Sequence, residues 1–229
     1  MAYPLYSPSP KRDHRANWLG KLLGVEKETD AKIEKVLEEA IVETRKALAK
    51  VEGDDLSANV KRLQYNLALR SIRRTLTEVF TDIGDIVRNG SKDAAVAAVE
   101  AGAVDDKKIL NAIFPNGEKV NEWLDSLKQT AERNVQATIM RVLKTEQPLS
   151  SRVYNTKALS NGMVSRAVNN GLVRGDSHDR IASSVIDLIR PDTKGGVSFA
   201  AKRLARTEIN NAYHAQSISQ NEEKPWVDH

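Results

Sequence analysis

The 229-residue chain contains no cysteine and few aromatic side chains, which make up 5% of its residues. Without cysteine it can form neither disulfide bonds nor thiolate zinc sites, a composition usual in a reducing cytoplasm. No run approaches the eighteen apolar residues of a membrane-spanning helix, so we expect no membrane partner. The N-terminal residues lack the apolar core of a signal peptide. We therefore expect a soluble intracellular chain.

Regular alternation of apolar and polar residues, the pattern of half-buried strands, is also missing, whereas apolar residues recur at helical spacing. This predicts an all-α protein, an elongated bundle of long helices followed by a smaller C-terminal helical module. Residues 150–173 are helical in tendency, but Asn161-Gly162 and Asn169-Asn170-Gly171 interrupt the pattern. The other predicted helices cover about 29–53, 57–90, 92–101, 106–114 and 118–145, then a helix capped by Asp176-Ser177 and one capped by Ser198.

Three sequential parts are expected. Residues 1–25 are predicted to be an extended basic arm, residues 26–147 a long-helix bundle, and residues 148–229 the C-terminal module, with a boundary near Pro148 or Gly117. Three prolines oppose helix formation in the arm. The arm is either a disordered tail or a strap that orders on a partner protein or on DNA. Its basic residues are Lys11, Arg12, Arg15 and Lys21.

The net charge of +4 is unevenly distributed along the chain. Residues 1–25 and 151–229 each carry a net charge of +3, and residues 26–150 carry −2. Arginines line the polar side of the predicted helix 57–90, where they form either a solvated face or a contact with DNA phosphates or a partner's carboxylates. Because no base-reading motif accompanies them, any DNA binding would be non-specific and salt-dependent. These residues are Arg70, Arg73, Arg74 and Arg88.

Motifs for catalysis are absent from the sequence. It has no phosphate-binding glycine loop, no nucleophile elbow and no paired-histidine metal motif. Asp176-Ser177-His178-Asp179 contains metal-ligand residue types, but a Ser and two Asp at a helix start are more typical of capping. We therefore expect no enzyme active site, no cofactor and no metal within this sequence.

The most informative segment is Lys202–Tyr213. Placed on a helix, its small apolar residues occupy one half of the circumference, and Glu208 falls in the middle of that half. A carboxylate buried there requires a partner, most simply an arginine on a neighbouring helix. The alanines beside it permit close helix packing. Arg203, Arg206 and Glu208 are therefore predicted to form an ion-pair network that fixes how this helix packs.

The same segment carries a family resemblance. Arg203-Leu-Ala-Arg-Thr-Glu208, followed by Asn211-Ala212, resembles the signature of MuF-like minor head proteins, which are head-morphogenesis proteins of tailed bacteriophages. The signature residues are Arg203, Arg206, Thr207, Glu208 and Asn211. The resemblance covers about the last 75 residues and includes Leu172-Val-Arg-Gly175, Ser177, Arg180-Ile-Ala182 and Lys224-Pro-Trp226.

The resemblance implies a non-enzymatic minor head protein, made in the host cytoplasm and located in the virion at the portal vertex inside the head. The implied partners are the portal protein, the major capsid or scaffolding protein, and packaged double-stranded DNA. The family normally continues beyond the Trp226 region, so the module is expected to lack a C-terminal segment or to be truncated. Two alternatives remain: a non-specific DNA-binding protein that uses the arm and the arginines, and an enzyme whose chemistry lies in a lost extension.

Overall fold

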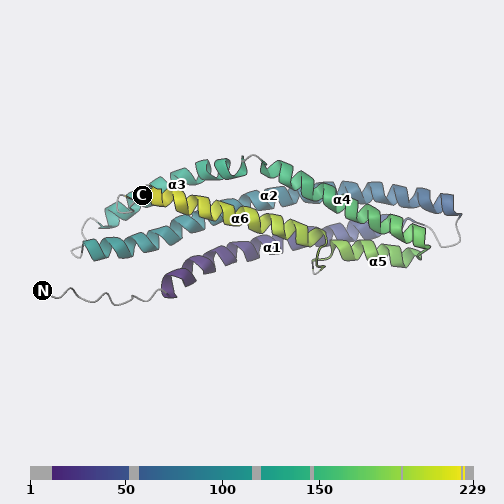
Figure 1. The fold of residues 1–229 in the computed structure, drawn as a ribbon, viewed down its shortest axis with the longest axis horizontal. Helices are drawn as coiled ribbons and strands as arrows, with labels where there is room; N and C mark the ends of the chain where they lie inside the picture. Colours follow the sequence, from purple (N-terminus) through teal and green to yellow (C-terminus); the bar gives the residue numbers. More distant parts are fainter. Residues whose placement is uncertain are drawn as a thin grey trace. The chain divides into compact units, whose positions relative to one another are not determined.

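The computed structural model describes residues 12–51, 57–114, 120–144, 147–191, 193–222 and 224, with side chains from Trp18 onward. Over these ranges the chain forms six helices and no strand, which confirms the predicted all-α helical bundle (Figure 1). The helices are α1 (Arg12–Leu48), α2 (Ala58–Ile113), α3 (Val120–Leu143), α4 (Leu149–Arg174), α5 (His178–Ile189) and α6 (Val197–Glu222). No described helix combines the length and the apolar character that crossing a bilayer requires.

Helix α1 begins at Arg12, so the extended conformation predicted for the arm is wrong for residues 12–25. The reason is that Trp18, Leu22 and Val25 continue the helical stripe of α1 toward its N-terminus. These side chains pack against α2 and α6 residues, including Ala98 and Tyr213. Lys11 and the residues before it lie outside the described part of the chain.

Helix α2 is a single element of 56 residues, and the breaks predicted at Gly90 and Gly102 are wrong. A glycine inside a helix costs about 1 kcal/mol relative to alanine, and the buried stripe that passes through both positions outweighs this cost. At Gly102 the absence of a side chain leaves room for the end of the Gln220 side chain. A Cβ atom there would lie 2.8 Å from Oε1 of Gln220 on α6.

Helix α4 is likewise continuous through Gly162 and Gly171, where the sequence predicted interruptions. Gly171 is buried, and a Cβ at this position would lie 2.5 Å from Cγ1 of Ile181 on α5. The glycine therefore sets how closely α4 and α5 approach. The helix ends at Gly175, whose φ of 71° is the left-handed conformation favoured at helix C-termini. The following N–H of Asp176 donates to the carbonyl of Gly171 at 2.9 Å.

The chain folds into two compact units, each built from separated segments. Unit 1 contains residues 1–26, 91–142 and 209–229, and unit 2 contains residues 27–90 and 143–208. These units differ from the sequential parts predicted with a boundary near Pro148. The difference arises because α1, α2 and α6 each contribute one end to unit 1 and the other to unit 2.

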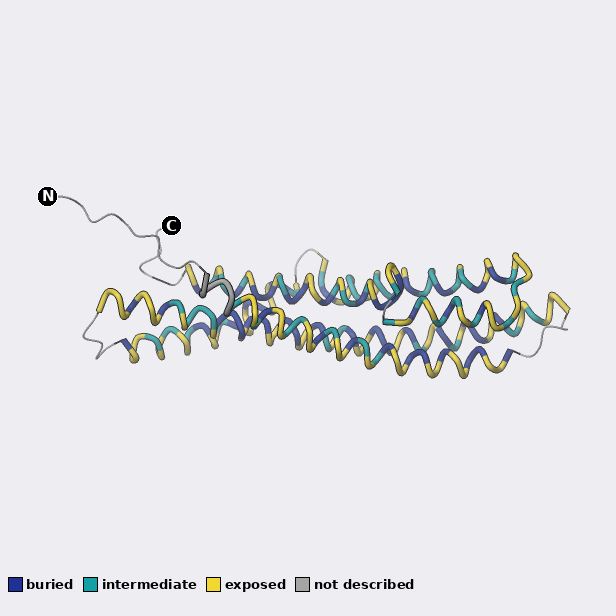
Figure 2. Tube along the Cα trace, turned by 90° about the horizontal axis from the view of Figure 1, so that it is seen from below, coloured by how far each residue is buried: buried dark blue, intermediate teal, exposed yellow. Residues whose placement is uncertain are grey.

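Each unit has its own apolar core. In every helix the buried residues repeat at helical spacing along the chain, as the alternating colours of Figure 2 show. Unit 1 has a small core formed by Leu22, Ala94, Ala97, Ala98, Ile209 and Tyr213. Unit 2 has the larger core, to which α1, α2, α4, α5 and α6 all contribute. Its large side chains from α1, α2 and α5 include Ile33, Leu37, Tyr65, Ile72, Phe80, Ile181 and Ile189.

Candidate functional site

Glu208 lies where its position on the helix predicted, fully buried in unit 2. Arg152 of α4 donates from Nη2 to Glu208 Oε2 at 2.6 Å, and the Arg152 side chain is 20% exposed. Ala201 and Ala205, both fully buried, line the same face of α6. The second carboxylate oxygen of Glu208 has no hydrogen-bond partner among the described residues.

Burial raises the pKa of the Glu208 carboxyl, and the nearby Arg152 charge opposes that increase. The direction shows that the loss of hydration outweighs the attraction of the single arginine. The buried pair therefore adds little net stability, although removal of one partner would leave the other charge buried without compensation. The sequence predicted an arginine partner, but not Arg152.

Two further cations of α6 pair with acidic residues of α1 in unit 2. Arg206 lies 2.5 Å from Asp30, and Lys202 contacts Glu34. The acidic residues are four positions apart on α1 and the cations are four apart on α6, as an antiparallel pair of helices requires. That matched spacing of opposite charges is a sequence signal for this contact.

The remaining signature residues lie on an exposed side of α6. Arg203, Thr207 and Asn211 are exposed and four residues apart, so they follow one side of the helix. Thr207 donates its hydroxyl to the Arg203 carbonyl at 2.9 Å. The signature therefore divides into Glu208 and Arg206, which make contacts within unit 2, and an exposed row of three residues.

Only some arginines of the stripe predicted on α2 bind other side chains of the protein. Arg70 and Arg74 are exposed. Arg73 donates to Ser165 of α4 at 2.8 Å, and Arg88 pairs with Asp85 at 2.5 Å. At 1.5 Å per residue, the stripe from Arg70 to Arg88 extends over about 27 Å.

Lys21, the one basic arm residue with a described side chain, and the arginine stripe belong to different units. Lys21 belongs to unit 1, where it pairs with Glu100 at 2.6 Å, whereas the stripe belongs to unit 2. Lys11 lies outside the described residues, and so do the side chains of Arg12 and Arg15. Their predicted contact with DNA or a partner protein remains a prediction.

Helix α4 supplies basic residues beyond those of the arm and the stripe. It contains four basic and no acidic residues, and α2 contains six basic and three acidic residues over 58–90. A groove of about 280 Å³ separates these helices, with Arg88 on the α2 side and Tyr154 and Lys157 on the α4 side. Lys157 Nζ lies 4.8 Å from the centre of the Tyr154 ring. The interruptions predicted in 150–173 obscured this helix in the sequence.

Residues of the segment Asp176–Asp179 begin helix α5 and make contacts within the protein. Ser177 is the N-cap residue of α5 as predicted, but its side chain makes no capping hydrogen bond. Asp176 pairs with Arg174 at 2.9 Å, and His178 Nδ1 lies 3.1 Å from the Tyr65 hydroxyl. Among the described residues, no group of His, Cys, Asp and Glu side chains is arranged to hold a metal ion.

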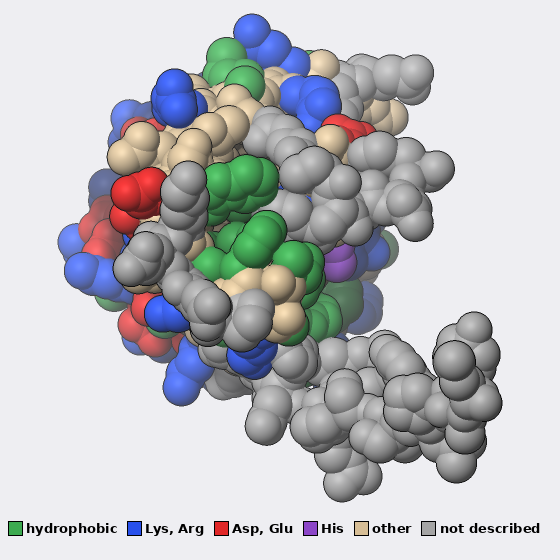
Figure 3. Space-filling model, turned by 90° about the vertical axis from the view of Figure 1, so that its left-hand side faces the viewer, with side chains coloured by type: hydrophobic (Ala, Val, Ile, Leu, Met, Phe, Trp, Pro, Cys, Tyr) green, Lys and Arg blue, Asp and Glu red, His purple; other side chains and the backbone are tan. Residues whose placement is uncertain are grey.

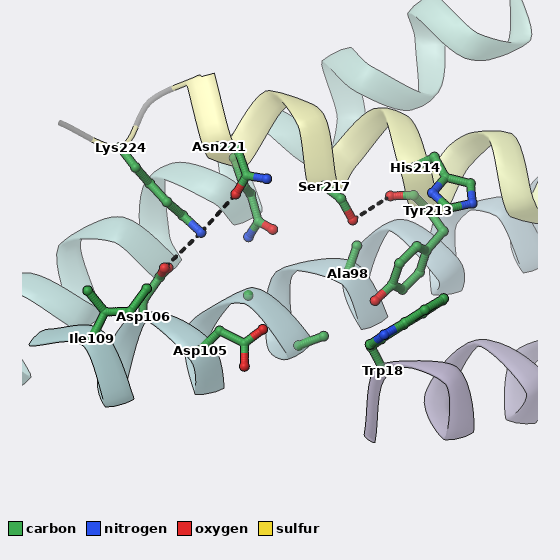
Figure 4. A pocket seen from close by; sticks show the side chains of 13 residues that line it. Trp18, Ala98, Asp105, Asp106, Ile109, Tyr213, His214, Ser217, Asn221 and Lys224 are labelled. Atoms are coloured by element: carbon green, nitrogen blue, oxygen red, sulfur yellow. Dashed lines mark hydrogen bonds and ion pairs between the residues drawn. The ribbon is translucent and has the colours of Figure 1, made fainter. Parts of the chain in front are cut away.

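A cleft of about 400 Å³ lies in unit 1 between α1, α2 and α6. Figure 4 shows Trp18 and Tyr213 at one end, Asp106 and Lys224 at the other, and Asp105 between them. Lys224 Nζ lies 2.7 Å from Asp106 Oδ1, and both side chains are buried. The two ring centroids are 5.8 Å apart with an interplanar angle of 32°.

Unit 1 also exposes apolar side chains near this cleft. Ile109 lines the cleft and is 41% exposed, and Ile113 and Phe114 follow it at the end of α2. Figure 3 shows hydrophobic side chains grouped on the face at this end, among Lys, Arg, Asp and Glu side chains. The surface at the end of α2 therefore carries both apolar and charged groups.

Comparison of the chain with protein-family models, curated proteins and solved structures finds no match.

Proposed function

We propose that this chain is a minor head protein of a tailed phage, which binds the portal vertex inside the head and assists assembly, packaging or DNA delivery. The observation that carries the proposal is the order and spacing of the signature Arg203–Glu208 and of the helix before it. The long helices and the exposed row on α6 support it, because they offer extended surfaces to a protein ring. The exposed row consists of Arg203, Thr207 and Asn211.

Co-expression with the portal protein encoded beside this chain tests the proposal. We expect a tagged chain to retain the portal protein through affinity purification and to migrate with it in size-exclusion chromatography. The portal protein of an unrelated phage, expressed in the same way, is the control for non-specific retention. A chain that purifies alone, or that retains both portal proteins equally, contradicts the proposal.

The distribution of charge favours a second candidate function, non-specific binding of double-stranded DNA. Residues 58–90 of α2 and helix α4 together carry ten basic and three acidic residues, and they lie on either side of one groove. A row of cations of this length can neutralise several phosphates of a DNA backbone. Along the sequence, the excess of basic residues lies at the two chain ends. In three dimensions, basic residues also outnumber acidic ones along this pair of helices.

Substitution of Arg70 and Arg74 by glutamine tests the second candidate. If both arginines contact phosphates, the double variant binds labelled duplex DNA more weakly, and the slope of log K against log salt falls by about 2. Fluorescence anisotropy over a range of salt concentrations measures both quantities. Lys32 and Lys35, which are exposed on α1 in the same unit, provide a matched double variant with an equal loss of charge. Equal effects of the two double variants would assign the binding to net charge alone.

A further inference from the structure

The N-terminal part of α2, residues 58–77, presents a row of large apolar side chains to solvent. Val60, Leu63 and Leu67 are 43%, 61% and 55% exposed. They are separated by three and four residues, so they follow one side of the helix. The side of α2 that contains Tyr65 is buried in the core of unit 2. The three exposed residues therefore form a second apolar side of α2, the seam, which lies outside that core.

Arginines continue the seam along the same side of α2. Arg70 and Arg74 follow Leu67 at intervals of three and four residues, and both are exposed. Neither arginine side chain forms a hydrogen bond or an ion pair with a described residue. The segment 58–77 as a whole carries five basic and no acidic residues. The apolar seam therefore ends beside unpaired positive charges, which favours a partner that carries carboxylates.

The width of the seam favours a partner helix over a lipid surface. Polar residues border it on both sides, with Asn66 and Arg73 on one side and Gln64 and Ser71 on the other. A single apolar row of this kind is the pattern by which two helices pack along each other. A helix that lies in a membrane surface buries a wider apolar face.

The charge and the chemistry of this side of α2 disfavour two other occupants. A second copy of the same surface would bring together two segments 58–77 that carry only basic charges, and like charges repel. A DNA backbone can contact Arg70 and Arg74, but its phosphates and sugars offer no large apolar group to cover Leu63 and Leu67. A helix with both apolar side chains and carboxylates matches the two parts of the surface.

We infer that the seam binds an acidic amphipathic helix of a partner protein. Apolar side chains of that helix, spaced by three and four residues, pack on Val60, Leu63 and Leu67. Its carboxylates pair with Arg70 and Arg74. Burial of the exposed apolar side chains supplies affinity, and the charge pairs set the orientation of the helix. The inference goes beyond both proposed functions and stands whether or not the partner is a phage portal protein.

Titration of the full chain with a labelled peptide of three heptads, each Leu-Ala-Ala-Leu-Glu-Ala-Glu, tests this inference by fluorescence anisotropy. These residues are strong helix formers. One control peptide has alanine in place of leucine, which removes the apolar row and keeps the charge. A second has lysine in place of glutamate, which keeps the row and reverses the charge. We expect saturable binding of the acidic leucine peptide and binding at least about tenfold weaker for each control.

Substitutions in the chain locate the surface. The double variant Leu63→Ser, Leu67→Ser should bind the acidic peptide at least about tenfold more weakly than the unaltered chain does. The double variant Val42→Ser, Leu159→Ser is the matched control and should bind as the unaltered chain does, because it changes exposed apolar positions elsewhere in unit 2. Thermal unfolding establishes that each variant is folded.

Several results would overturn the inference. They are equal binding of the three peptides, unchanged binding by the folded Leu63→Ser, Leu67→Ser variant, or no binding up to the solubility limit of the acidic peptide. Light scattering of the chain alone shows whether a second copy covers the seam, and co-sedimentation with phosphatidylglycerol vesicles shows whether a lipid surface does. Self-association, vesicle binding or duplex-DNA binding that the leucine double variant abolishes would also overturn the inference.

Discussion

Replacement of Glu208 by alanine should destabilise the protein by about 3–5 kcal/mol. The Glu208 carboxylate is fully buried, and its removal leaves the largely buried guanidinium group of Arg152 without its acid partner. Urea unfolding followed by circular dichroism measures the change. Arg203→Ala provides the control, because Arg203 lies five residues earlier on the exposed face of the same helix. We expect the control to change the free energy of unfolding by less than about 0.5 kcal/mol.

A double-mutant cycle separates the pair from the cavity that alanine creates. The double variant with both Arg152 and Glu208 changed to alanine should lose less stability than the sum of the single variants, with an interaction energy of about 1–3 kcal/mol. Strict additivity would show that the two charges do not stabilise each other. Unchanged stability in Glu208→Ala alone would place the carboxylate in solvent.

The raised pKa of the Glu208 carboxyl group predicts how the stability of the protein depends on pH. Because burial raises the pKa of Glu208 in the folded state, the folded protein binds its proton more tightly than the unfolded chain does. Its contribution to stability is therefore complete below the ordinary pKa of 4.5 and falls as the pH rises through the folded-state pKa. Relative to Glu208→Gln, the unaltered protein should lose stability as the pH increases from 4 toward neutrality. If the unaltered protein instead gains stability relative to Glu208→Gln as the pH rises, the attraction of Arg152 has a larger effect on the pKa of Glu208 than burial has.

Replacing the two glycines within α4 by alanine, one at a time, should change the free energy of unfolding in opposite directions. At Gly171 a Cβ would lie 2.5 Å from Cγ1 of Ile181, which is 1% exposed and has no room to move, so Gly171→Ala should cost about 1–3 kcal/mol. At Gly162 no atom lies within 4 Å of the added carbon, so Gly162→Ala should stabilise the helix by up to about 1 kcal/mol. Chemical unfolding of both variants measures the two changes.

Each glycine variant is the control for the other, because both make the same chemical change in the same helix. If both stabilise, α5 has moved away from α4 and the close contact with Ile181 is not required. Two destabilised variants would instead indicate that the helix is interrupted in this region, as the sequence pattern alone suggested.

The sequence predicts the helical class and the buried position of Glu208 because both depend on spacing along a single helix. It does not identify Arg152, since the choice among neighbouring helices depends on tertiary packing. The sequence pattern predicts breaks at Gly90, Gly102, Gly162 and Gly171, yet all four glycines lie inside helices. At Gly171 the missing side chain makes room for α5, a condition that appears only when the partner helix is known.

The cleft of unit 1 could not be predicted from the sequence either. Its residues come from Trp18, from α2 and from the end of α6, and no local motif connects positions so far apart in the chain. In the sequence Lys224 belongs only to the family resemblance, whereas in the structure it forms a buried pair with Asp106. The spacing of four between Asp30 and Glu34, matched by Lys202 and Arg206, is a signal from which one long-range contact could have been found.

The division of α6 between the units has a consequence for synthesis on the ribosome. Unit 2 needs residues up to 208 and unit 1 needs residues from 209 onward, so neither core is complete until α6 has been translated. The apolar stripes of α1 and α2 emerge well before the helix that covers them. The nascent chain therefore exposes these stripes during most of its elongation, and both units gain their final packing only after α6 has left the exit tunnel.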